Sequence, residues 1–435
     1  MLLRLLRDSK GGIAPLLGLS LVPIMAGLGA AIDYSRASSV HAAMQAAGDA
    51  TALMLARNSS ILGGNQLQQD AKDFFLANFN RPEATNLQVA ATYTQGTGGF
   101  NVTVNASASV ATQFMTLLGF SQIPLNTTGS VKWNNSKLRV ALVLDNTGSM
   151  AQYGKMTALK TAAKNLLTQL QQVVVNAGDV YVSIIPFAKD VDVDPTNYDQ
   201  NWIAWSGSSD TWDENNGTCN SKHTSYTTQS SCVAHGHTWT PKNHNTWNGC
   251  VMDRDQNFDT TNTAPTAGST LFPAEQYSYC PVPLMGLSYD WTALNAKLDA
   301  MTPNGGTNQA IGLQWGFQSL TSAPLYVPPM DPNYQYKQYI ILLTDGLNTQ
   351  DRWYGNGSTQ SPQVDARQQI LCNNIKAAGI TVYTVQVNTD GDPTSTLLQQ
   401  CASDPSKFFL LTSANQIVTT FGTIGMSLMT LYLAK

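Results

Sequence analysis

The sequence predicts an α/β fold with a doubly wound, mostly parallel sheet over residues 136–435. Apolar, strand-like runs alternate with amphipathic, helix-like stretches along this region, as in sheets built from right-handed crossovers. The run at 138–144 is almost entirely apolar, which is typical of a strand buried on both faces of a parallel sheet. Small polar residues follow it directly, where open α/β sheets bind their ligands.

Near the N-terminus, residues 11–32 form an apolar segment that is long enough to span a bilayer. Three basic residues precede it: Arg4, Arg7 and Lys10. The positive-inside rule places the N-terminus in the cytoplasm and everything after Asp33 outside. We therefore expect a single-pass protein of the inner (cytoplasmic) membrane whose bulk is periplasmic or otherwise extracytoplasmic, with surface display left open. A cleaved signal peptide is the alternative, because residues 29–31 are small enough for a peptidase.

A helix continues from the apolar span, and a small α+β module follows it. Apolar residues between 34 and 58 recur three and four positions apart, which marks one face of a helix. A short helix at 66–80, a hairpin around the turn QGTGG and one further strand make up the module. This divides the chain into residues 1–58, 59–135 and 136–435. We interpret the middle segment as a spacer or packing module, since nothing in it carries chemistry.

A Cys-rich insertion interrupts the alternation of strands and helices at residues 190–283. It is rich in Asn, Thr, Ser, Trp and Tyr, holds four of the six cysteines and shows no sustained periodicity. Its aromatic content argues against full disorder. It leaves from a strand end and returns before Thr307, so we expect it on the ligand-bearing face and outside the core. The alternation then resumes and ends in an apolar helix from Asn415, which we expect to pack on the sheet rather than span a membrane.

Five oxygen-bearing side chains follow the predicted strands or open the helix after a loop. They are Asp145, Thr147 and Ser149 after the first buried strand, Thr307 in PNGGTNQAIGL, and Asp345 at the end of YIILLTDG. Hydroxyl and carboxylate oxygens are ligands that suit Mg²⁺. Asp and Thr after strands are also ordinary turn residues, but three such matches in chain order favour a shared site.

Together, these five residues resemble the metal-ion-dependent adhesion site of von Willebrand factor A domains. The resemblance implies a von Willebrand A-like domain with Mg²⁺ (or Mn²⁺) held by the hydroxyls of Thr147, Ser149 and Thr307. Asp145 and Asp345 would bind directly or through water. One coordination position would then be left for an acidic group of a protein partner. Thr147 stands where serine is more usual in the family, and it retains the oxygen.

The N-terminal region carries a second resemblance. The apolar span followed by AIDYSRASSVHAAMQAAGDATALMLAR resembles the TadE/TadG-like segment of tight-adherence (Flp) pilus-assembly proteins, over roughly residues 11–58. NTWNGCVMDRD and SYCPVPLMGL in the insertion are similar to stretches of TadG proteins. The resemblance implies a retained anchor running into a pilin-like helix, a role in pilus assembly or adhesion, and a partner in the pilus machinery or a surface ligand. No early acidic residue follows Gly12, so processing by prepilin peptidase is not expected.

The cysteines are expected to form disulfides, because an exported chain would oxidise its thiols. The TadG-like resemblance implies a bridge between Cys372 and Cys401. For the remaining four we expect Cys250–Cys280 and Cys219–Cys232. Four histidines lie among the cysteines of the insertion and leave a zinc site as the alternative, although no Cys-x₂-Cys pair is present: His223, His235, His237 and His244.

Composition and motifs exclude several classes of function. The net charge is −4 and no basic tract is present, so nucleic-acid binding has no electrostatic support. The sequence holds no Gly-x-Ser-x-Gly, His-Glu-x-x-His or phosphate-binding loop motif, and we do not expect an enzyme. The favoured prediction is a membrane-anchored adhesion or pilus-assembly protein. A structural pilus subunit is the first alternative, and a zinc-dependent envelope enzyme centred on the insertion is the second.

Overall fold

The computed structural model describes residues 13–57, 64–96, 99–133, 136–174, 176–222 and 224–433. The chain divides into two compact units, one up to residue 135 and one from residue 136, with residues 332–334 counted in the first. The basic residues used above to orient the anchor, and one histidine of the insertion, lie outside the described residues: Arg4, Arg7, Lys10 and His223.

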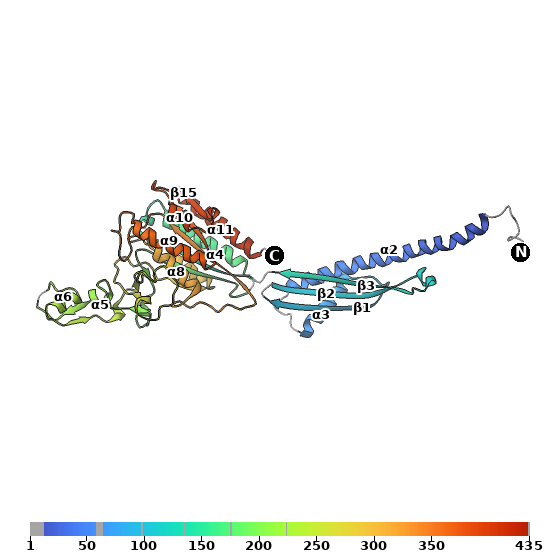
Figure 1. Cartoon of the computed structure of the whole chain (residues 1–435), viewed down its shortest axis with the longest axis horizontal. Helices are drawn as coiled ribbons and strands as arrows, with labels where there is room; N and C mark the ends of the chain where they lie inside the picture. The colour runs from blue at the N-terminus through green and yellow to red at the C-terminus, as the bar shows by residue number, and fades with distance from the viewer. Residues whose placement is uncertain are drawn as a thin grey trace. The chain divides into compact units, whose positions relative to one another are not determined.

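The first unit is built on one long helix, α2 (Ile13–Arg57), which continues through Pro23. The second half of α2 packs against α3 (Gly64–Asn78) and an antiparallel sheet (Figure 1). The strands of this sheet are β1 (Ala84–Gly96), β2 (Gly99–Ala111) and β3 (Gln122–Trp133), with the short helix η2 (Met115–Leu118) between the last two. The pilin-like helix and the module, expected as separate segments, therefore share one core.

Alternation and small residues explain this packing. Along β2, buried and less buried positions alternate, as the predicted hairpin requires. Val40 and Met44 of α2 are fully buried against Phe75 of α3 and the apolar face of the sheet. A Cβ placed on Gly129 of β3 would come within 2.6 Å of the backbone of Gly48, so glycine is required where the strand crosses the helix.

The second unit contains a six-stranded sheet with the order β12-β5-β4-β13-β14-β15. Its strands are β4 (Ser136–Asp145), β5 (Val180–Phe187), β12 (Met285–Ser288), β13 (Gln335–Thr344), β14 (Thr381–Val387) and β15 (Phe408–Leu411). All neighbouring strands are parallel except β12, which pairs antiparallel with β5. The predicted doubly wound, mostly parallel sheet is confirmed.

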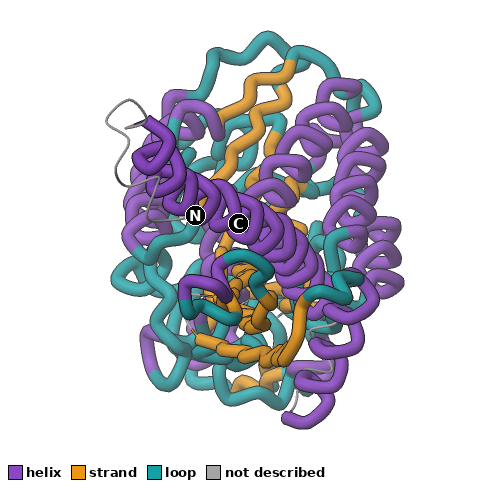
Figure 2. Tube along the Cα trace, turned by 90° about the vertical axis from the view of Figure 1, so that its right-hand side faces the viewer, coloured by secondary structure: helices purple, strands orange, loops and turns teal. Residues whose placement is uncertain are grey.

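Helices cover both faces of this sheet (Figures 1 and 2). One face carries α4 (Lys155–Gln172), α7 (Trp291–Ala300) and α11 (Asn415–Leu433), and the other carries α8 (Gln309–Thr321), α9 (Pro362–Ala377) and α10 (Thr396–Cys401). Leu142 and Val143 of β4 are both fully buried, on opposite faces. Phe421 of α11 is fully buried against the first face, which confirms that the closing helix packs on the sheet. Within the described residues, α2 is the one helix long and apolar enough to cross a membrane.

The insertion consists of short elements stapled by disulfides. Its strands and helices are β6 (Val191–Asp192), η4 (Pro195–Asn197), β7 (Ile203–Ala204), α5 (Trp212–Asn215), β8 (Gly217–Cys219), α6 (Gln229–Ala234), β9 (Trp239–Pro241), η5 (His244–Thr246), β10 (Cys250–Val251), η6 (Gly268–Thr270) and β11 (Phe272–Pro273). Outside the insertion, the 3-10 turn η3 (Gly148–Ala151) follows β4, and the 3-10 turn η7 (Pro405–Lys407) precedes β15.

The expectation that the insertion lies outside the core is wrong. Rings of Trp202 and Phe272 lie with their centroids 6.2 and 4.2 Å from that of Trp315 on α8, and they join the hydrophobic cluster on that face of the sheet. Large aromatic side chains bury well from irregular backbone, so periodicity is not needed for a segment to contribute to a core. Part of the insertion is therefore structural.

Three disulfides join the six cysteines: Cys219–Cys232, Cys250–Cys280 and Cys372–Cys401. These are the three pairs predicted above. The third connects α9 to α10 across β14. Because every thiol is consumed, the insertion has no thiolate left for a zinc ion.

Candidate metal centre

The candidate centre begins where β4 ends, at Asp145. This carboxylate is fully buried, and its Oδ1 accepts hydrogen bonds from the N–H and the hydroxyl of Thr147, at 2.8 and 2.6 Å. Its Oδ2 accepts a third from the hydroxyl of Thr344, at 2.7 Å. Thr344 is the last residue of β13, the neighbouring parallel strand, so the two strand ends meet at one edge of the sheet. Thr344 is not among the five residues predicted from the sequence.

A chain of short contacts links Asp145 to Asp345. The hydroxyl oxygens of Thr147 and Ser149 lie 3.2 Å apart, and the Ser149 hydroxyl donates to Asp345 Oδ1 at 2.7 Å. Asp345 is 2% exposed. Four of the five residues named from the sequence are thus brought together by direct hydrogen bonds between residues almost 200 positions apart.

The loop of Thr307 joins this group through its backbone. The N–H of Gly148, between Thr147 and Ser149, donates to the carbonyl of Gly305 at 3.0 Å. Thr307 itself is held by Thr349, whose hydroxyl accepts from the Thr307 N–H at 2.9 Å and whose N–H donates to the Thr307 carbonyl. Three loops, after β4, before α8 and after β13, therefore meet at the candidate centre.

A buried cation that was not predicted from the sequence lies beside Asp345. Lys155, the first residue of α4, is fully buried, and its Nζ lies 2.6 Å from Asp345 Oδ2 and 2.8 Å from Asp390 Oδ2. Burial by itself would lower the pKa of Lys155, but the ion pairs with Asp345 and Asp390 raise it above its ordinary value. The signal in the sequence was its spacing: Lys155 lies four residues before the fully buried Leu159, on the apolar face of the helix.

Burial also shifts the pKa of Asp145. Removal from water raises the pKa of Asp145 to about 7, and the neighbouring charge of Asp345 adds to the rise, while the hydrogen bonds from Thr147 and Thr344 oppose it. A carboxylate with this pKa would exchange its proton for a cation near neutral pH.

The donor set fits a hard cation rather than zinc. Two carboxylates and three hydroxyls supply only oxygen, the ligand type that Mg²⁺ and Mn²⁺ prefer. No group of three or more His, Cys, Asp or Glu side chains capable of holding a metal occurs among the described residues. Any ion held here would therefore depend on the hydroxyls of Thr147, Ser149 and Thr307, with the cation of Lys155 beside Asp345.

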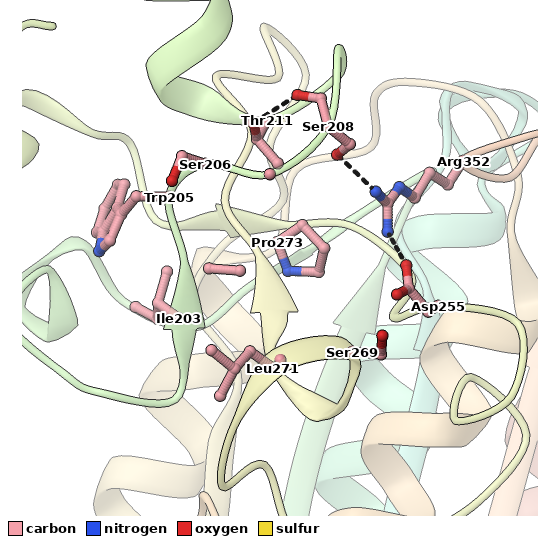
Figure 3. A pocket seen from close by; sticks show the side chains of 13 residues that line it. Ile203, Trp205, Ser206, Ser208, Thr211, Asp255, Ser269, Leu271, Pro273 and Arg352 are labelled. Carbon is pink, nitrogen blue, oxygen red and sulfur yellow. Dashed lines mark hydrogen bonds and ion pairs between the residues drawn. The ribbon is translucent and has the colours of Figure 1, made fainter.

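A pocket of about 470 Å³ lies in the insertion (Figure 3). Strands β7 and β11 form part of its wall, and Trp205 stands at one side. Arg352 closes another side, where it donates hydrogen bonds to Ser208 at 2.9 Å and to Asp255 at 3.3 Å. It also donates to Asp210 at 2.6 Å. Arg352 is three residues after Thr349, which holds Thr307. The loop after β13 therefore contributes Thr349 to the candidate metal centre and Arg352 to the pocket.

Two known families match separate parts of the chain. Residues 11–57 match the Flp pilus-assembly TadE/G-like family, and residues 269–423 match the von Willebrand factor type A domain. The second match contains Thr307 and Asp345, whereas Asp145, Thr147 and Ser149 precede it. The chain combines a TadE/G-like N-terminal region with a von Willebrand factor type A domain. No curated protein matches it.

Several solved structures are similar to the chain at low identity. The pilus adhesin SpaC from Lactobacillus rhamnosus GG is 16% identical with a TM-score of 0.37, over 81% of this chain and 35% of SpaC. The vWF domain of the type V pili tip protein Mfa5 from Porphyromonas gingivalis is 10% identical with a TM-score of 0.38, over 69% of this chain and 97% of that domain. The adhesive tip pilin GBS104 from Group B Streptococcus agalactiae is 10% identical with a TM-score of 0.34, over 80% of this chain and 70% of GBS104. The chain spans only about a third of the length of SpaC.

Proposed function

We propose that this chain is a membrane-anchored, extracytoplasmic component of a Tad-type pilus system whose A domain binds a protein partner through Mg²⁺ or Mn²⁺. The hydrogen-bonded series Asp145–Thr147–Ser149–Asp345 is the observation that carries the proposal. It places two carboxylates and two hydroxyls from distant segments at one edge of the sheet, with the loop of Thr307 beside them.

Each residue has a distinct part in this proposal. The hydroxyls of Thr147, Ser149 and Thr307 would hold the ion, and Asp145 and Asp345 would bind it directly or through water. The ion would supply a concentrated positive charge for an acidic group of the partner. Lys155 already neutralises one oxygen of Asp345, so the loaded centre would carry less negative charge and attract an anionic group more strongly.

The membrane anchor is proposed to be the first half of α2. Eight large apolar side chains of this half are exposed on the helix surface: Leu17, Leu19, Leu21, Val22, Ile24, Met25, Leu28 and Ile32. Such a surface is costly in water and suited to hydrocarbon. The apolar segment is continuous with the half of α2 that packs in the first unit, which favours retention of the anchor over its removal as a signal peptide.

Binding of Mn²⁺ to the purified full chain tests the metal part of the proposal. Asp145→Asn keeps the size of the side chain and removes its charge, and Asp299→Asn is the control because Asp299 is exposed on α7. We expect paramagnetic resonance to show stoichiometric binding to wild type and to the control, and greatly weakened binding to Asp145→Asn. Equal binding by all three proteins, or by none, would overturn the metal site.

A structural pilus subunit is the second candidate, because α2 joins an exposed apolar half to a half packed on a small sheet, as a pilin-like helix would. Immunogold labelling separates the two roles. Label along the length of purified filaments would favour the subunit, and label confined to the membrane or to filament ends would favour assembly or adhesion.

A further inference from the structure

The connection between β2 and β3 carries an apolar surface that the first unit leaves uncovered. Residues 112–122 contain no charged side chain. Phe114, Leu117, Leu118 and Phe120 are 41%, 83%, 54% and 61% exposed. Exposed large apolar residues gathered at one loop tip are uncommon on a soluble surface and mark an interaction site. We call residues 113–120 the tip loop.

The tip loop lies against the apolar half of α2, not against the half buried in the module. Figure 1 shows the end of the β2–β3 hairpin beside this part of the helix, and Phe114 packs directly on Gly29. A Cβ at Gly29 would lie 2.4 Å from the Cβ of Phe114, so only glycine permits the contact. Farther along the helix, a groove of about 490 Å³ is lined entirely by apolar residues of the two segments: Leu21, Val22, Met25, Ala26, Phe114, Leu117 and Leu118.

The position of these contacts along α2 gives the depth of the tip loop. Leu21 precedes Asp33 by twelve residues, which corresponds to about 18 Å along a helix. The hydrocarbon core of a bilayer is about 30 Å thick, so one leaflet contributes about 15 Å. If Asp33 marks the outer boundary of the span, the tip loop reaches through the depth of one leaflet beside the helix.

Most backbone N–H groups of the tip loop are hydrogen-bonded within the protein, as an apolar environment requires. In hydrocarbon, each unsatisfied N–H or C=O group costs several kcal/mol. The N–H groups of Gln113, Phe114 and Met115 all donate to the carboxylate of Asp33, at 2.9, 2.8 and 2.8 Å. Four more N–H groups between residues 112 and 120 donate to carbonyls of the same connection: those of Thr112, Leu117, Gly119 and Phe120. Asp33 is 2% exposed, so its charge is enclosed by these donors.

We propose that the tip loop inserts into the bilayer leaflet that surrounds the outer half of the α2 span, and that the first unit is attached to the membrane at two points. The occupant of the exposed surface is lipid hydrocarbon because the surface is continuous with the apolar span, carries no charge and has most of its backbone N–H groups hydrogen-bonded within the first unit. A two-point attachment fixes the tilt and rotation of the first unit on the membrane, which a single helix does not. The inference rests on the proposed membrane anchoring of α2.

Fluorescent labelling in vesicles tests the insertion. All native cysteines are in disulfides, so an added cysteine provides a single free thiol. The full chain with Leu117→Cys, Ile24→Cys or Asn80→Cys is labelled with an environment-sensitive dye and reconstituted into phosphatidylethanolamine–phosphatidylglycerol vesicles. Ile24 reports the α2 span, and the exposed Asn80, after α3, reports the aqueous side of the first unit. Each sample is quenched by nitroxide-bearing lipids and, separately, by aqueous iodide.

We expect the labels at 117 and 24 to lose emission with nitroxide lipids and to resist iodide, and the label at 80 to do the reverse. Quenching of 117 by iodide while 24 responds to lipid would overturn the tip-loop insertion and leave the anchor intact. Iodide quenching of 24 would instead overturn the anchor itself. Resistance of 117 to both quenchers would show that protein, such as a second copy of the chain, covers the tip loop, and would also refute insertion.

Discussion

Replacing Lys155 with methionine should destabilise the A domain in EDTA and make it more responsive to Mg²⁺. Methionine keeps most of the volume of the stem and removes the charge that faces Asp345 at 2.6 Å and Asp390 at 2.8 Å. Both the Lys155 and the Asp345 side chains are 0% exposed, so no solvent replaces the lost partner. Removing one member of a buried ion pair costs about 3–5 kcal/mol. The lower end applies here because Ser149 still donates to Asp345.

A divalent cation should recover much of that loss in the variant. At a concentration 100 times its dissociation constant, a ligand of the folded state adds about 2.7 kcal/mol to the free energy of unfolding. In wild type, the ion must share Asp345 with the ammonium group of Lys155, whereas in Lys155→Met it meets an uncompensated carboxylate. We therefore expect Mg²⁺ to stabilise the variant more than wild type.

Urea unfolding followed by tryptophan fluorescence measures both effects. Eight of the nine tryptophans lie after residue 136, so the signal reports mainly the second unit. Lys164→Met is the matched control on α4, because Lys164 pairs with the exposed Asp299 and a surface pair of this kind is worth at most about 1 kcal/mol. Equal stability of Lys155→Met and wild type in EDTA would refute the buried-pair argument. Equal stabilisation of both by Mg²⁺ would refute competition at Asp345.

Four further outcomes are expected. The pKa of Asp145 is raised to about 7 and a cation requires its charged form, so the affinity for Mn²⁺ measured by titration calorimetry should fall about tenfold from pH 8 to pH 6. Without metal, the raised pKa has the opposite consequence: the contribution of Asp145 to the free energy of unfolding should fall as the pH rises from about 4 to 7. Phe272→Ala should cost about 3–5 kcal/mol in the urea assay, because the ring packs on Trp315. Replacing residues 217–241 by a short Gly/Ser linker should change the free energy of unfolding little in the same assay. The flanking residues Asn216 and Lys242 are already joined by a backbone hydrogen bond, so a short linker can connect them. Cys372→Ala with Cys401→Ala should lose about 3–4 kcal/mol relative to the oxidised protein, as expected for a loop of this length, and a smaller loss would argue against the loop-entropy account.

Local patterns in the sequence were enough for most of the A domain. Burial of a strand on both faces leaves a continuous apolar run, and burial of one helix face leaves a three-and-four spacing, so β4 and α4 were recognisable without any tertiary information. Because the carboxyl ends of parallel strands share one edge of a sheet, the same patterns placed Asp145 and Asp345 near one another. The long apolar N-terminal helix was equally evident, since about twenty successive uncharged, mostly apolar residues are typical of a helix that can span a bilayer.

Only the tertiary structure decided the features that depend on contacts between distant residues. The ion pairs of Lys155 with Asp345 and Asp390 join residues 190 and 235 positions apart, and no periodicity connects them. Trp202 and Phe272 lie in irregular backbone, and the aperiodic sequence around them suggested a surface role. Their packing on Trp315 contradicts that expectation. The tip loop is an ordinary uncharged turn in the sequence. Its contact with Gly29 and the enclosure of Asp33 arise because the β2–β3 hairpin runs alongside α2, and a local pattern carries no information about which segment a hairpin will meet.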